Sequence, residues 1–92
     1  MSKIIKLQAS QETPTVNVPT NVNSGKLVRI LNVDAAAEVL ITQKTALPAA
    51  DTVGTITLEF GQELFITKEP TDTLEFSGGH TTDVLMVSVA FA

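Results

Sequence analysis

The residues from Thr55 to Gly79, TITLEFGQELFITKEPTDTLEFSGG, alternate apolar and polar side chains three times, with turns at a glycine and at a proline between them. Successive side chains of a β-strand point to opposite faces, so this period of two predicts strands with one buried face. Ile56 and Leu58 form the apolar series of the first strand, and Phe60 continues it. The segment is therefore predicted to form a three-stranded meander that supplies half of a sandwich core.

The two strands that follow repeat the pattern. Leu64 and Ile66 are predicted to face the core, and so are Leu74 and Phe76. The turn before them is expected at Gly61, because glycine tolerates the positive φ of a tight hairpin. The turn between them is expected at residues 70–72, where proline, threonine and aspartate follow one another.

Along the whole chain, Val, Ile and Thr are abundant, and turn residues recur at intervals of roughly 8 to 12 residues, which is typical of sandwiches and barrels. Helical signals are nearly absent, since DAAAEV at 34–39 is short enough to be a loop. Strands are predicted over residues 4–9, 15–22, 27–33, 38–43, 55–59, 64–68, 73–76 and 84–91. The fold class is therefore predicted to be all-β, an antiparallel, jelly-roll-like β-sandwich of about eight short strands in one domain, residues 1–92.

The last predicted strand is apolar on both faces. One face carries Val84, Met86 and Ala90, and the other carries Leu85, Val87, Val89 and Phe91. Such a strand is either central between two layers or covered on its outer face by a partner chain. Residues 27–33 are similar, interrupted only by Arg29 and Asn32. The interface candidates are the face with Leu85, or whichever face is not internal, together with Phe65 on the outward face of its strand.

The segment from Ala9 to Gly25 is more polar, and Pro19 lies within its VNVPTNV stretch. Proline removes a ladder donor, so a strand here should lie at an edge or break in two. Two interpretations remain open for the segment. It is an extended arm that becomes ordered on contact with a partner, or it forms two ordinary edge strands.

Composition narrows the function classes. With 43% hydrophobic and 17% charged residues, the 92-residue chain is typical of a folded domain rather than a disordered one. A net charge of -4 and six scattered basic residues argue against nucleic acid as a partner, and no segment reaches the ~20 apolar residues of a membrane helix. So small a domain buries only about 60 to 65% of its unfolded surface. With no cysteine available for disulfides, self-association is the expected supplement.

Candidate chemistry is sparse. His80 is the one histidine, so it alone could activate a serine, and we expect it to be an exposed loop residue. The alternative is a metal or pH-sensitive site built from several copies around a symmetry axis. The carboxylates Glu59 and Glu75 occupy outward positions, and without Trp or Tyr there is no broad platform for a sugar. We predict no enzyme, with no catalytic, cofactor-binding or metal-binding residues.

The order KLVRILNVDAAAEVLIT, VGTITLEFGQELFITKEPTDTLEF and VLMVSVAFA, from Leu27 to Ala92, resembles a group of small proteins encoded among the structural genes of marine and cyanobacterial tailed phages. The resemblance implies a β-sandwich assembled in the host cytoplasm into the virion, and we expect a capsid decoration or cement protein on the head. Implied partners are copies of the same chain, with a trimer favoured by analogy, and the major capsid protein or other virion proteins. A tail or fibre accessory and a carbohydrate-binding module in host recognition are the alternatives.

Overall fold

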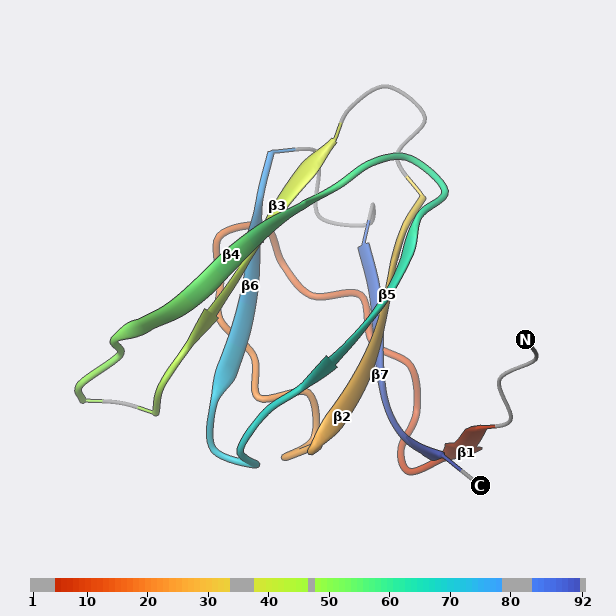
Figure 1. Ribbon diagram of the computed structural model, residues 1–92, viewed down its shortest axis with the longest axis horizontal. Helices are drawn as coiled ribbons and strands as arrows, with labels where there is room; N and C mark the ends of the chain where they lie inside the picture. Colours follow the sequence, from red (N-terminus) through yellow and green to blue (C-terminus); the bar gives the residue numbers. More distant parts are fainter. Residues whose placement is uncertain (1–4, 34–37, 47, 79–83, 92) are drawn as a thin grey trace.

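The computed structural model describes residues 5–33, 38–46, 48–78 and 84–91, which fold into two antiparallel sheets packed face to face (Figure 1). Within these ranges the chain forms seven strands and no helix. The strands are β1 (Ile5–Leu7), β2 (Leu27–Asn32), β3 (Val39–Lys44), β4 (Thr52–Leu58), β5 (Glu63–Thr67), β6 (Thr73–Ser77) and β7 (Val84–Phe91). The predicted all-β sandwich is confirmed.

The strands pair in a nested order. Sheet A has the order β1-β7-β2-β5 and sheet B the order β4-β3-β6, with antiparallel neighbours throughout. The first strand pairs with the last, β2 with β5, and β3 with β4, while an isolated bridge joins Thr20 to Leu74 in β6. The described strands thus form a long antiparallel ribbon rolled into two layers, an arrangement that resembles a jelly roll.

The strand expected at residues 15–22 is not formed. Asn17 has a φ of 62° and Val22 a φ of 50°, both in the left-handed region, and Pro19 between them has no N–H to donate. What remains is a pair of backbone hydrogen bonds between Thr20 and Leu74, of 2.9 and 2.8 Å, and one from the Asn17 N–H to the Phe76 carbonyl. The prediction of a strand was wrong, but the segment still covers the free edge of β6.

The polar segment of residues 9–25 runs from one sheet to the other. Near its start, Glu12 exchanges two backbone hydrogen bonds with Met86 of β7, of 2.8 and 2.9 Å. Near its end, Val22 is fully buried in the core. The segment therefore covers the edge of β7 beyond β1 and then the edge of β6 (Figure 1, orange).

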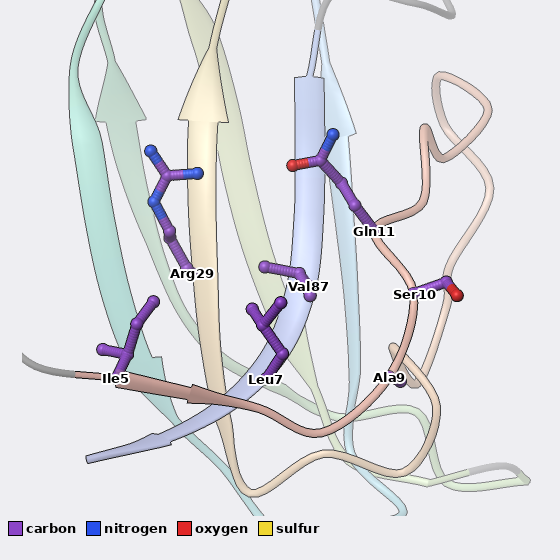
Figure 2. A pocket seen from close by; sticks show the side chains of 7 residues that line it. All are labelled: Ile5, Leu7, Ala9, Ser10, Gln11, Arg29 and Val87. Atoms are coloured by element: carbon purple, nitrogen blue, oxygen red, sulfur yellow. The ribbon is translucent and has the colours of Figure 1, made fainter. Parts of the chain in front are cut away.

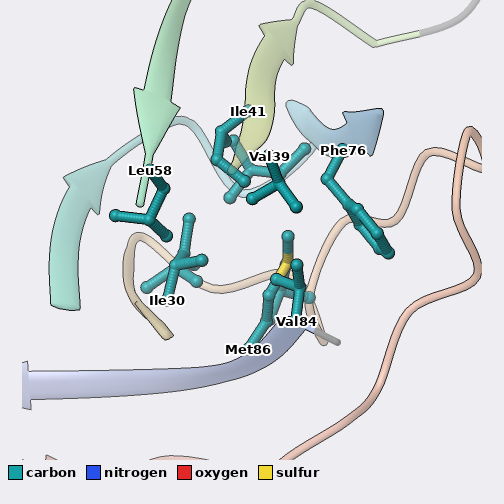
Figure 3. Packing of buried hydrophobic residues seen from close by; sticks show 10 residues of the cluster. Ile30, Val39, Ile41, Leu58, Phe76, Val84 and Met86 are labelled. Carbon is teal, nitrogen blue, oxygen red and sulfur yellow. The ribbon is translucent and has the colours of Figure 1, made fainter. Parts of the chain in front are cut away.

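The core lies between the two sheets. Figure 3 shows Val39 and Ile41 of sheet B facing Val84 and Met86 of sheet A. The buried apolar cluster consists of Val22, Val28, Ile30, Val39, Ile41, Leu58, Leu74, Phe76, Val84 and Met86. Burying each large apolar side chain stabilises the fold by about 1.5–3 kcal/mol. Leu74 and Phe76 are buried as predicted, and Leu64 and Ile66 pack half-buried against the cluster.

The predicted meander of β4, β5 and β6 is wrong. β5 belongs to sheet A as the partner of β2, and β3 lies between β4 and β6 in sheet B. Of the apolar series in and after β4, only Leu58 is buried, whereas Ile56 is 46% and Phe60 59% exposed. β4 is an edge strand, and the β3–β4 hairpin projects beyond sheet A, so little of the opposite layer covers its first residues (Figure 1).

One buried polar side chain joins the two sheets. Asn32, at the end of β2, is fully buried, and its Nδ2 donates to the Leu58 carbonyl of β4 at 2.9 Å. Its backbone C=O accepts from the N–H of Gly61 at 2.8 Å, and its N–H donates to the Gln62 carbonyl at 3.2 Å. Gly61 has a φ of 78°, as expected for this turn. Asn32 therefore holds the turn at which the chain crosses from sheet B to sheet A.

We predict that Asn32→Leu lowers the free energy of unfolding by about 0.5–1.5 kcal/mol, because it removes the hydrogen bond from the Asn32 amide to the Leu58 carbonyl in an apolar interior. Equilibrium unfolding in urea would measure the loss. Gln8→Leu, the same kind of change at an exposed position, serves as the control. A loss for Asn32→Leu no larger than that of the control would contradict a structural role for this amide.

Candidate functional site

The outer face of sheet A is apolar. Directly paired residues of neighbouring strands share a face, and the register places Arg29 of β2 between Val87 of β7 and Phe65 of β5. Following the same register along the sheet gives the rest of this surface. The contact face, as we call it, consists of Ile5, Leu7, Leu27, Arg29, Leu31, Glu63, Phe65, Thr67, Leu85, Val87 and Val89.

Four of the five predicted interface residues, Phe65, Leu85, Val87 and Val89, lie together on the contact face. Val87 and Val89 are only 4% and 3% exposed, and Leu85 and Phe65 are half-buried. Phe91 pairs with Ile5 through the backbone of β7, but its side chain lies outside the described part of the structure. Because Val84 and Met86 point into the core, the Leu85 side of β7 is the outer one.

Sequence reasoning missed four apolar members of the contact face, Ile5, Leu7, Leu27 and Leu31. Leu7 is 68% exposed and pairs with Val89, while Leu27 and Leu31 are half-buried on β2. The apolar character of residues 27–33 on both faces was the available signal for the two β2 leucines. Leu7 had a weaker signal, since its strand is only three residues long.

A shallow pocket of about 510 Å³ lies between the contact face and the N-terminal segment (Figure 2). It is lined by Ile5, Leu7, Ala9, Ser10, Gln11, Arg29 and Val87. The Arg29 Nε donates to the Glu63 Oε2 across the β2–β5 pair, so a neighbouring carboxylate balances this positive charge. The arrangement is that of an apolar contact surface with one paired charge near its centre.

Lys44, Glu75 and Glu12, which lie away from the contact face, have partners of their own. Glu75 pairs with Lys44 at 2.9 Å on sheet B, and Glu12 accepts a hydrogen bond from the Thr20 hydroxyl at 2.7 Å. In the described ranges no three His, Asp or Glu side chains gather closely enough to hold a metal ion. His80, with its expected exposed loop position, lies outside those ranges.

Lys68 is a buried cation, only 8% exposed. Its Nζ donates to three carbonyls of the following turn, those of Glu69 at 3.2 Å, Pro70 at 3.3 Å and Asp72 at 2.9 Å. Burial lowers the pKa of Lys68 from its ordinary value of 10.5, while the nearby Asp72 carboxylate acts in the opposite direction. Perturbed lysines can mark functional sites, but this ammonium bonds to its own turn and its role is structural.

Comparisons with family models, with curated proteins and with solved structures returned no match to this chain. No helix in the described residues is long and apolar enough to cross a membrane. The function is therefore inferred from the contact face, together with the resemblance of the sequence.

A pH series tests the environment of Lys68. Because the pKa of Lys68 is lowered in the native state, this lysine binds more protons in the unfolded chain than in the folded one at pH values between the native pKa and 10.5. The free energy of unfolding therefore rises with pH across that interval. We expect the wild type to gain stability relative to Lys68→Met as the pH approaches 10.5. Urea unfolding of both proteins measures the difference, and a difference that stays constant or shrinks would contradict a lowered native pKa.

Proposed function

We propose that this protein is a non-catalytic structural component that acts by contact, as a decoration or cement protein on the head of a tailed phage. The contact face carries the proposal. Sheet A buries one apolar face in the core, and its opposite face offers half-buried Leu27, Leu31 and Leu85 and exposed Leu7. An antiparallel sheet in water usually has a polar outer face, so an apolar one favours a covering partner.

The chemistry of this face suits association. Its apolar side chains lie on strands, which hold them rigidly and reduce the entropy lost on binding. The Arg29–Glu63 pair gives the face one balanced polar element rather than a field of one sign. A protein that binds only the assembled form of a shell stabilises that form by mass action, which needs contact area and no reaction.

The placement on a phage head comes from the resemblance of residues 27–92 to structural proteins of tailed phages. Capsids present threefold and quasi-threefold positions, so a closed trimer is the expected form of the protein there. The jelly roll recurs in viral capsid proteins, but it also occurs in lectins and cupins, so the fold alone carries little weight.

Self-association can be tested without a known partner. We expect native mass spectrometry at low micromolar concentration to detect a closed oligomer, and Leu85→Lys to weaken assembly at least about tenfold by placing a charge in the contact face. Leu7→Lys places the same charge at a more exposed position of the contact face, so it tests this face even if Leu85→Lys does not fold. Val18→Lys, an exposed site on the loop beside β6, is the control. A folded Leu7→Lys with wild-type assembly would contradict the role of this face.

Binding to heads provides the second test. Empty heads of the phage whose structural genes encode the protein should co-sediment with the wild type and resist heating better in its presence. Leu7→Lys should bind less, whereas Val18→Lys should bind as the wild type does. If saturating wild-type protein neither sediments with the heads nor raises their disruption temperature, the placement on the head is wrong.

A further inference from the structure

The edges of the two sheets differ in how they are protected. Natural sheets blunt free edges with charges, prolines, short strands or a covering segment. β6 is covered by the loop around Thr20, β1 has only three residues and includes Lys6, and β5 begins with the charged Glu63. Each of these edges therefore carries a feature that discourages pairing with another chain.

β4 has none of these features along most of its length. Its sequence, TVGTITL, contains neither charge nor proline, and six of its seven residues are exposed. A register irregularity opposite residues 43–44 affects only its beginning. Among the described strands, β4 is thus the one long, neutral and uncovered edge, and such an edge is a template for strand pairing.

The hydrogen bonds of β6 indicate which backbone groups of β4 are available. Leu74 exchanges both of its backbone hydrogen bonds with Thr20, so these groups point away from β3. Alternate residues of an antiparallel strand direct their N–H and C=O to opposite sides. Leu74 pairs with Gln43 of β3, and Gln43 pairs with Gly54 of β4, so the backbone groups of Gly54 point toward β3. By alternation along β4, the N–H and C=O groups of Thr55 and Thr57 point outward, away from β3.

We propose that β4 pairs in an antiparallel manner with β4 of a second copy of this chain, which joins two three-stranded B sheets into one continuous sheet. The absence of charge favours a second copy as the occupant. Around a twofold axis, residues near the axis meet their own counterparts, so a charged side chain there would face its own charge. The uncharged β4 has no such conflict.

The side chains select the register. Ile56 is 46% exposed, beside an open hollow of about 210 Å³ that Ile41 and Ile66 also line. A twofold axis at Ile56 brings it against the partner's Ile56 at a non-hydrogen-bonded position, where Cα atoms are ~4.5 Å apart and side chains are closest. The same register pairs Thr55 with the partner's Thr57, so the outward N–H and C=O groups of these two residues form the hydrogen bonds between the strands. Threonine pairs are favourable across strands.

This contact ends with two copies. The opposite edge of the joined sheet is β6 in each copy, and the loop around Thr20 occupies it. The β4 pairing is also independent of the contact face, because β4 belongs to sheet B and the contact face to sheet A.

Native mass spectrometry tests the pairing with a lysine variant. Ile56→Lys places two ammonium groups opposite each other, so we expect it to weaken the β4 contact at least about tenfold and to reduce the mass of the wild-type assembly. Val18→Lys is a matched control, since Val18 is 49% exposed and its loop lies beside β6. A folded Ile56→Lys protein that keeps the wild-type mass overturns the proposal.

Disulfide trapping tests the register even if the lysine variant does not fold. The chain has no cysteine, so one introduced thiol reports one contact. Mild oxidation should convert most of Ile56→Cys to a covalent dimer, because the expected Cα separation lies within disulfide range. Thr55→Cys and Val18→Cys should remain mostly monomeric on a denaturing gel. Equal dimer yields for all three, or none for Ile56→Cys, would overturn the pairing.

The two proposals fail separately. If Leu7→Lys leaves assembly unchanged while Ile56→Cys still cross-links, the contact face is wrong and the β4 pairing stands. If Leu7→Lys reduces assembly while Ile56→Cys gives no dimer, the β4 pairing is wrong and the contact face stands.

Discussion

The buried amide of Asn32 fixes where the chain passes from one sheet to the other. Its bond to the Leu58 carbonyl joins the end of β2 to the end of β4, and its backbone holds the turn that follows. That turn starts β5 in register with β2, which places Phe65 beside Arg29 on the contact face. Because β5 leaves sheet B at this point, β4 remains as its edge. A single polar group in an apolar interior thus determines both surfaces on which the functional proposals rest, and leaving it unpaired there would be costly.

Alternation, the abundance of Val, Ile and Thr, and the spacing of turn residues were together enough to locate seven strands to within a few residues. They could not assign those strands to sheets. Neighbours in sequence are usually neighbours in space, which favours a meander, but a rolled ribbon pairs strands that are far apart in the chain. The same limit explains why Ile56 is exposed although the sequence places it in the core series. Alternation puts Ile56 on the same face as Leu58 but does not indicate how far the opposite sheet extends.

The contact face was partly visible in the sequence. A strand that is apolar on both sides must have two apolar environments, so Leu85 and Val87 could be singled out. Which side of β7 faces the core depends on the pairing of β7 with β1 and β2. The sequence of β7 itself does not contain this pairing. Lys68 shows a different limit. In the sequence it is an ordinary lysine next to a proline turn, and only the folded turn brings three carbonyls to its Nζ.

The two surfaces use different parts of the chain for association. The contact face presents side chains on rigid strands, so its specificity lies in shape and apolar area. The β4 edge presents backbone groups, which any strand could bind, and its selectivity has to come from the neutral, self-compatible sequence around Ile56. A small domain with a limited core gains stability from either contact. Since the surfaces lie on different sheets, the two proposed contacts use different residues, and a subunit that makes both joins neighbours in two directions.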